Sequence, residues 1–146
     1  MITMREATMA DAAALTTLMH DLGYQATEAD VQGRLSTLLH HADYRTLVAT
    51  TGNNEVVGMI GLIKNYHYEH NGCYIRIGAL VVKKEQRKLG IGRLLMEEAE
   101  RWARQSGANA LLLNSGNREE RTAAHAFYKS LGYEIKSSGF VKWLPK

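Results

Sequence analysis

The chain has 146 residues, 45% of them hydrophobic, with a formal net charge of +3 and a single cysteine, Cys73. This size predicts one domain over residues 1–146. The sequence has no apolar run long enough to cross a bilayer, no apolar signal core and no cysteine pair, which predicts a cytoplasmic protein without a membrane partner. Acidic and basic residues are interleaved without a long basic run, which argues against nucleic acid as a partner.

The first part of the chain predicts a strand followed by two helices. Residues 2–7 read as a short strand, and Asp11 starts a helix that ends at Gly23. Thr27 is a typical cap for a second helix. Each helix has one apolar face, formed by Leu15, Leu18, Met19 and Leu22 in the first and by Val31, Leu35, Leu38 and Leu39 in the second.

The middle of the chain predicts a hairpin, a loop and a further strand. Residues 46–51 and 56–64 flank a turn rich in glycine and asparagine, which is typical of a hairpin. The polar and aromatic residues 65–72 read as a loop at a strand end. Residues 74–82 form the next strand, which leads into the basic, glycine-containing turn 83–92.

The last part of the chain predicts two helices with a strand between them. A long amphipathic helix follows the basic turn, with Leu94, Leu95, Glu98, Ala99 and Trp102 at helical spacing, and Gly107 closes it. The elements after it are a strand at 110–114, a helix at 121–130, and a final hairpin formed by 133–138 and 140–144. This order of elements predicts a mixed α/β architecture in which helices cover one sheet.

The turn from Lys83 to Arg93 carries the most specific chemistry. Gly90 and Gly92 allow a ligand to approach the backbone closely. The helix that begins there presents unpaired N–H groups and a partial positive charge, to which Arg87, Lys88 and Arg93 add full charges. These features predict a binding site for a pyrophosphate, and the alternative is an ordinary glycine-containing turn. The pattern is neither a Walker loop nor a dinucleotide fingerprint.

The second informative segment is the helix at 121–130 and its end. Ala124, Phe127 and Leu131 give this helix a core face, and Tyr128 lies beside that face. Taken alone, Tyr128 is more typical of an aromatic residue at the edge of the core.

In this order and at this separation, the two segments resemble the GCN5-related N-acetyltransferase (GNAT) superfamily. Arg87, Gly90 and Gly92 match its coenzyme A motif Q/R-x-x-G-x-G/A, and residues 124–133 resemble its segment A-x-x-F/L-Y-x-x-x-G-F/Y. Within the superfamily, residues 55–62 and 121–125 are most similar to the branch that contains aminoalkylphosphonate N-acetyltransferases. The resemblance implies an α/β (α+β) fold with a mixed, mostly antiparallel twisted sheet of about seven strands flanked by about four helices.

The resemblance also implies acetyl-coenzyme A (acetyl-CoA) as co-substrate. Its pyrophosphate is expected on residues 87–93, and its pantetheine arm between the strands 74–82 and 110–114. Tyr128 is expected to protonate the departing thiolate or to bind its sulfur. The implied cofactor-binding residues are Leu80, Val81, Val82, Arg87, Lys88, Leu89, Gly90, Ile91, Gly92, Arg93, Asn117, Arg121 and Tyr128.

The sequence departs from the family pattern at two places. Many members carry a glutamate base on the strand before the motif, whereas residues 75–79 contain no carboxylate. An asparagine often precedes the tyrosine by seven positions; Arg121 stands there, and Asn117 is a nearby replacement. An amine must lose a proton before it attacks, because its pKa is about 10, and a backbone N–H near Val82 is a candidate donor to the oxyanion.

The loop at 65–70 is the best candidate for the acceptor side. Glu69 is suited to attract an ammonium group, and His67 or His70 to act as a base or a metal ligand. The alternative is a solvated polar loop, and no metal is predicted. The candidate substrate-contacting residues are Tyr24, Tyr66, His67 and Glu69.

These observations predict an N-acetyltransferase that moves the acetyl group of acetyl-CoA to a primary amine of a small molecule, by direct attack through a tetrahedral intermediate. The alternatives are an acetyltransferase acting on protein lysines or N-termini, a non-catalytic acyl-CoA sensor, and a nucleic-acid binder. A homodimer is a further expectation from the resemblance.

Overall fold

The computed structural model describes residues 1–114 and 122–145. They divide into two compact units, Met1–Leu112 and Leu113–Lys146. The first unit contains the sheet and the first three α-helices, and the second contains the last helix. The expectation of a single domain stays a prediction.

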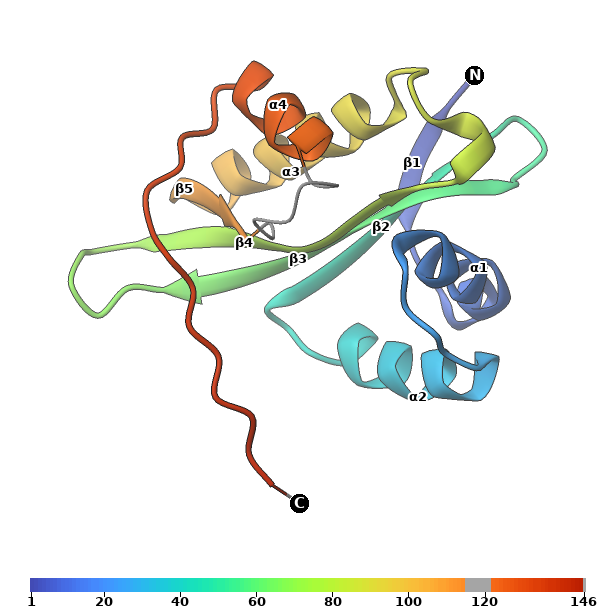
Figure 1. Ribbon diagram of the computed structural model, residues 1–146, viewed down its shortest axis with the longest axis horizontal. Helices are drawn as coiled ribbons and strands as arrows, with labels where there is room; N and C mark the ends of the chain where they lie inside the picture. The colour runs from blue at the N-terminus through green and yellow to red at the C-terminus, as the bar shows by residue number, and fades with distance from the viewer. Residues whose placement is uncertain (115–121, 146) are drawn as a thin grey trace. The chain divides into compact units, whose positions relative to one another are not determined.

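One twisted sheet forms the centre of the first unit (Figure 1). Its strands lie in the order β1-β2-β3-β4-β5, and the first three pairs are antiparallel. β5 follows a helical crossover and begins beside the beginning of β4, where the Cys73 thiol lies 3.6 Å from the Ser106 carbonyl. The strands are β1 (Thr3–Glu6), β2 (Tyr44–Thr50), β3 (Val56–Tyr66), β4 (Cys73–Val82) and β5 (Ala108–Leu113).

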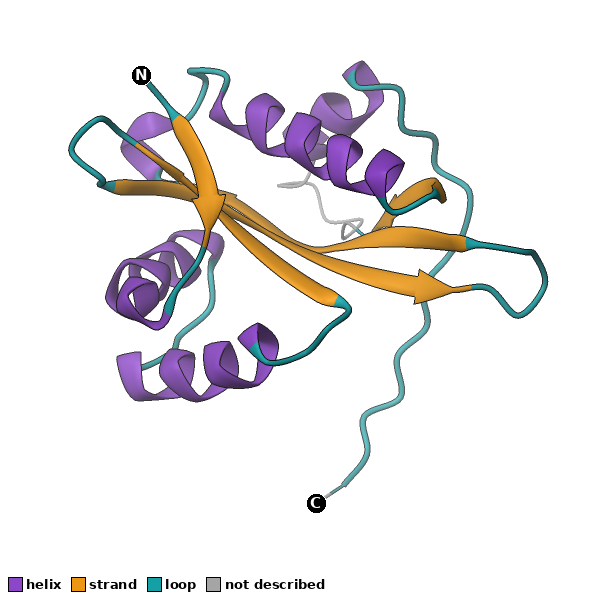
Figure 2. Ribbon diagram, turned by 180° about the vertical axis from the view of Figure 1, so that it is seen from behind, coloured by secondary structure: helices purple, strands orange, loops and turns teal. Residues whose placement is uncertain are grey.

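Helices cover both faces of this sheet. α1 (Ala12–Leu22) and α2 (Glu28–Leu39) lie on one face, and α3 (Ile91–Gln105) lies on the other, as Figures 1 and 2 show from opposite sides. The first face is filled by a cluster of buried apolar side chains from the two helices and the sheet: Ala7, Ala12, Leu15, Leu18, Val31, Leu35, Val48, Met59 and Val81. None of the helices within the two described ranges is long and apolar enough to span a membrane.

Local sequence signals set the ends of these helices. Gly23 ends α1 in the left-handed conformation, with φ 104°. At the start of α2 the Thr27 hydroxyl accepts from the Asp30 N–H, and the Asp30 carboxylate accepts from the Thr27 N–H, each at 3.1 Å. A 3₁₀ turn, η1 (Met9–Asp11), precedes α1, and another, η2 (Lys84–Gln86), follows β4.

The second unit contains α4 (Thr122–Ser130), after which Gly132 adopts φ 94°. The predicted final hairpin at 133–138 and 140–144 is wrong, because the described residues 131–145 contain no strand. A two-stranded hairpin is only marginally stable unless further strands or a helix cover its apolar face. The side chains of Phe140 and Trp143 are 94% and 87% exposed, so this segment buries little apolar surface.

The predicted fold class is confirmed. The sheet is mostly antiparallel and flanked by helices, with five strands and four α-helices among the residues that the structure describes, instead of about seven strands. The difference is the final hairpin.

Candidate functional site

The basic turn, residues 83–93, has the backbone geometry of an anion site. Lys88 and Gly90 both adopt left-handed conformations, with φ 67° and 86°. Left-handed residues within a turn direct neighbouring backbone N–H groups toward a common point. The first helical hydrogen bond of α3 runs from the Leu94 N–H to the Gly90 carbonyl at 3.1 Å, so the N–H groups of residues 91–93 have no partner within the helix. No side chain caps this end.

The strain at Lys88 is itself informative. A residue with a Cβ adopts this conformation at a cost of roughly 1–2 kcal/mol, and such strain is concentrated at functional sites. The side chains of Lys88 and Arg93 are exposed and have no hydrogen-bond or ion-pair partner within residues 1–114 and 122–145. Two uncompensated cations therefore stand beside a positive helix end, and the combination fits a pyrophosphate.

Side chains from elsewhere hold the turn in place. Arg87 donates from Nε to the Val82 carbonyl and from Nη2 to the Asp21 carbonyl, both at 3.2 Å. The Asp21 carboxylate accepts from the Lys84 N–H at 3.2 Å. Arg87 thus uses two of its donors to tie the turn to β4 and to the end of α1. Asp21 was missed by the sequence analysis, because nothing local marks a partner 63 residues away.

Close packing fixes the start of α3 over the sheet. Ile91 and Leu95 are 2% and 0% exposed, and both lie above Gly58 of β3. A Cβ at Gly58 would stand 3.2 Å from Leu95 Cδ1 and 3.2 Å from the Val81 carbonyl oxygen. The absence of a side chain at Gly58 therefore lets the helix start sit directly against β3 and β4.

A β-bulge interrupts β4 upstream of the turn. Gly61 pairs with Ala79 and Leu62 with Ile77, so Gly78 is the extra residue. A bulge leaves a backbone group unpaired and re-aims the side chains around it. The bulge lies on the strand that leads to the basic turn.

The predicted cofactor residues of β4 differ in their surroundings. Val81 is 3% exposed and belongs to the core cluster under α1. Leu80 and Val82 are half-buried and lie opposite Ile60 and Gly58 on the α3 side. Only the backbone of Val81 is therefore able to contact a ligand, whereas Leu80 and Val82 also offer side chains.

The predicted loop begins later than expected, because β3 extends through Tyr66. In the loop that follows, His67 is held on both sides. Its Nδ1 lies 3.3 Å from Glu69 Oε1, and its Nε2 lies 2.9 Å from the side-chain oxygen of Asn109 on β5. The Asn109 amide nitrogen donates to the Asn71 carbonyl at 3.5 Å, which sets the orientation of this amide. His67 also stacks on Tyr74 with centroids 4.8 Å apart. These contacts favour a structural tie between the loop and β5 over a free base.

The other predicted substrate residues are more open. Tyr66 is 63% exposed, with the Lys64 ammonium 5.7 Å from its ring centroid. Tyr24 is 64% exposed and lines a hollow of about 800 Å³ together with His20, Thr27 and Asp30. Within the described parts of the chain, no group of three or more His, Cys, Asp or Glu side chains is placed to hold a metal ion.

A second hollow, of about 670 Å³, lies between β1, α1 and the β2–β3 turn. Its charged side chains neutralise one another: Arg5 donates twice to Asp11 at 2.9 Å, and Lys83 lies 2.7 Å from Glu55. The hydrogen bond from Arg5 holds the pKa of Asp11 below its usual value. The ion pairs in this hollow therefore fix the positions of β1 and of the start of the basic turn.

The predicted acid, Tyr128, lies on α4 in the second unit. Its ring contacts Phe127 and Tyr133, with centroids 5.4 Å and 6.2 Å away, and its carbonyl accepts the Tyr133 N–H at 3.1 Å. Two other predicted cofactor residues, Asn117 and Arg121, lie outside the described residues.

Comparison with known proteins decides the family. The family model described as "Acetyltransferase (GNAT) family" matches residues 12–133. The chain belongs to the GNAT family. The predicted family and the predicted enzyme class, an acetyltransferase acting on amines, are confirmed. GNAT enzymes use acetyl-CoA as the acetyl donor.

The similarity to individual relatives covers most of this chain. An aminoalkylphosphonate N-acetyltransferase of Salmonella typhimurium is 36% identical over 128 residues, which cover 87% of this chain and 78% of the relative. An aminoglycoside N(6')-acetyltransferase of Stenotrophomonas maltophilia is 30% identical over 135 residues, 90% and 86% of the two chains. The crystal structure of a GNAT family acetyltransferase from Staphylococcus aureus is 34% identical, with a TM-score of 0.83 over 98% of each chain.

Proposed function

We propose that this GNAT enzyme transfers the acetyl group of acetyl-CoA to a primary amine of a small molecule, by direct attack of the amine on the thioester. The observation that carries the proposal is the basic turn, with left-handed backbone at Lys88 and Gly90 in front of an uncapped helix start. The β4 bulge supports it, because it stands on the strand that this turn follows.

The basic turn holds the donor substrate in this proposal. The N–H groups of residues 91–93 donate to the pyrophosphate, while Lys88 and Arg93 neutralise its charge. Arg87 contributes by keeping the turn in shape, through its bonds to Val82 and Asp21. The pantetheine arm then lies along β4 and pairs with its free backbone groups, as an added strand does.

The bulge stabilises the charge that develops during the reaction. As the amine attacks the thioester carbonyl, that oxygen becomes negative in a tetrahedral intermediate. A preorganised backbone N–H at residues 78–80 donates a hydrogen bond to this oxygen, and one such donor contributes roughly 10²-fold or more to the rate. Because Gly78 is exposed, the amine approaches from the open side of β4.

Proton transfers must accompany this attack. At neutral pH only about one alkylamine in a thousand is unprotonated, so the ammonium group first loses a proton. Residues 75–79 provide no carboxylate for this step, and we propose that water accepts the proton. Attack leaves a second surplus proton on the nitrogen, which passes to water as the C–S bond breaks. Tyr128 donates its hydroxyl proton to the departing thiolate and regains a proton from water, so that the products are the acetamide and free coenzyme A.

The test follows the release of free thiol from acetyl-CoA against aminoalkylphosphonates, polyamines, amino acids, aminoglycosides and lysine peptides. Release that depends on one small amine and falls in Tyr128→Phe supports the proposal. Preference for the lysine peptides would show a protein acetyltransferase instead. Binding of acetyl-CoA without transfer to any amine would show an acyl-CoA sensor.

A further inference from the structure

The sheet face around the β4 bulge bears the exposed cation Arg76. Along β4 the side chains of Ile75 and Ile77 are buried, while Arg76 between them points to the opposite face and is exposed. Arg76 forms no hydrogen bond and no ion pair with any residue in the described ranges. Its cross-strand neighbour, Ile63, is uncharged.

Arg76 lies on the face of the sheet where the bulge is open. A Cβ at Gly78 would stand 3.2 Å from Ile63 Cδ1, so Gly78, Ile63 and Arg76 share this face. The next residue, Ala79, packs against the core cluster under α1. This cluster therefore covers β4 only beyond the bulge. Gly78 is two positions after Arg76, which is about 7 Å along the strand, a distance that an arginine side chain spans.

The surroundings of Arg76 are aromatic and carry few free carboxylates. Tyr74 precedes it on the same face, and Tyr44 lies opposite Ile63 on β2. Each tyrosine contacts a histidine ring at a centroid distance of 4.8 Å, Tyr44 with His41 and Tyr74 with His67. The nearby Glu69 carboxylate faces His67 at 3.3 Å.

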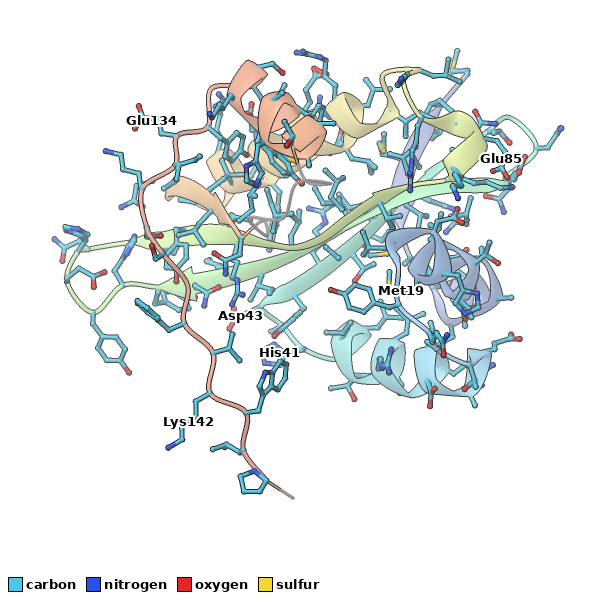
Figure 3. All side chains as sticks on the ribbon, in the orientation of Figure 1. Met19, His41, Asp43, Glu85, Glu134 and Lys142 are labelled. Atoms are coloured by element: carbon cyan, nitrogen blue, oxygen red, sulfur yellow. The ribbon has the colours of Figure 1, made fainter. Side chains whose placement is uncertain are left out.

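Asp43 is a second acidic residue to consider among the described residues. It lies beside His41 just before β2 (labelled in Figure 3), and its N–H donates to His41 Nδ1 at 3.2 Å. Its carboxylate does not reach Arg76 within ion-pair distance. The guanidinium group therefore has no internal counter-charge across the part of the molecule that the structure describes.

We propose that Arg76 binds an anionic group of the acceptor, so that the substrate is a primary amine that also carries a phosphonate, phosphate or carboxylate. This inference rests on the proposed function, since it places the acceptor on the open side of the bulge. The planar guanidinium donates two parallel hydrogen bonds to such a group and positions the amine at the other end of a short chain. The same charge repels polycations, which gives selectivity by repulsion as well as attraction.

The test compares three amines with the same two-carbon chain: 2-aminoethylphosphonate, ethanolamine and ethylenediamine. We expect the wild type to acetylate 2-aminoethylphosphonate with the highest kcat/KM. Arg76→Gln should lower that value about 10- to 100-fold, the loss of one bidentate charged pair, while the value for ethanolamine changes less than about twofold. The KM for acetyl-CoA and the Tm should stay unchanged. Arg76→Lys should recover only part of the loss, because an ammonium group lacks the fork.

Arg104→Gln is the matched control, because Arg104 is an exposed arginine near the end of α3 on the other face of the sheet. Arg104→Gln should leave kcat/KM for all three amines unchanged. If Arg76 were merely solvated, Arg76→Gln would also leave these values unchanged. Equal or better use of ethylenediamine by the wild type, or an Arg76→Gln variant that keeps its use of 2-aminoethylphosphonate, would overturn the inference.

Calorimetry separates this inference from the proposed function. Coenzyme A is titrated first, and 2-aminoethylphosphonate is then titrated into the coenzyme A-bound protein and into its Arg76→Gln variant. Failure of coenzyme A to bind counts against the proposed function, and the phosphonate titration is then made on the free protein. Phosphonate binding that is at least about tenfold weaker in the variant supports the role of Arg76, and absence of phosphonate binding to the wild type contradicts it.

Discussion

The basic turn and the free sheet face around Arg76 lie at the two ends of the same strand, β4, but they are built differently. The turn is made of backbone: left-handed residues, unpaired N–H groups and a helix start. The sheet face is made of side chains that come from separate strands and meet only through the register of β2, β3 and β4. In a family with a common donor and varied acceptors, the backbone-built region suits the shared ligand, and the side-chain-built region suits the variable one.

The largest expected effect is on the chemical step and not on the binding of acetyl-CoA. Tyr128→Phe removes the hydroxyl group that serves as the acid, and we expect kcat to fall about 100-fold, the usual scale for loss of a general acid. The KM for acetyl-CoA should change little. Steady-state thiol release checks both values, with Tyr133→Phe as a control from the same unit. A fall of the same size in Tyr133→Phe would show damage to the second unit rather than loss of an acid.

A substitution at Gly90 tests the backbone character of the turn. Gly90→Ala places a Cβ at φ 86°, where the ligand approaches, and we expect coenzyme A to bind about 30-fold more weakly, or about 2 kcal/mol. Gly107 is its matched control: it lies after the other end of α3 with φ 73°, and both positions have open space around a Cβ. Calorimetry should show unchanged affinity in Gly107→Ala. Equal loss in both variants would assign the effect to general strain.

Features that depend on local sequence were predictable, whereas features that depend on distant residues were not. Caps, glycines and apolar periodicity are local, so the helices, the hairpin of β2 and β3 and the basic turn were all predictable. The final hairpin failed because a strand needs a pairing partner as well as an apolar pattern. The support from Asp21 and the bond between His67 and Asn109 join residues far apart in the chain, and no local pattern marks them.

Arg76 shows the same limit in the acceptor region. In the sequence, residues 75–79 are distinguished only by the lack of a carboxylate. The register of β3 and β4, with its extra residue at Gly78, is what places the Arg76 side chain on the open face of the bulge. A one-residue change in that register would turn it toward α3.

A change outside both regions should affect stability alone. Asp11 is 6% exposed and accepts two hydrogen bonds from Arg5 at 2.9 Å. We expect Asp11→Asn to lower the free energy of unfolding at pH 7 by about 2 kcal/mol, as for hydrogen bonds to a charged group, and to leave the affinity for coenzyme A unchanged. Urea unfolding and calorimetry measure the two quantities.

The same pair makes this loss depend on pH. Because the pKa of Asp11 is lowered in the folded protein, its stabilisation is complete above the unfolded pKa of about 3.9 and is lost as the pH falls through the folded pKa. The difference between wild type and Asp11→Asn should therefore shrink below about pH 4. A difference that stays constant down to pH 2 would contradict the ion pair.

The smallest expected effect concerns the support of the turn from α1. Asp21→Ala removes the acceptor of the Lys84 N–H, and we expect the KM for acetyl-CoA to rise about fivefold at unchanged kcat, which corresponds to about 1 kcal/mol. Glu28→Ala removes an exposed carboxylate on α2 and serves as the control. If Asp21→Ala lowers kcat with every amine and leaves this KM unchanged, then Asp21 does not act through the turn.

Amide hydrogen exchange tests most directly the claim that backbone groups of the basic turn bind the donor. Coenzyme A should slow exchange of the N–H groups of residues 88–93, whereas pantetheine, which has no pyrophosphate, should leave them unchanged. The N–H groups at the other end of α3 serve as the internal reference. If saturating coenzyme A leaves residues 88–93 exchanging as in the free protein, the pyrophosphate binds elsewhere and the account of this site is wrong.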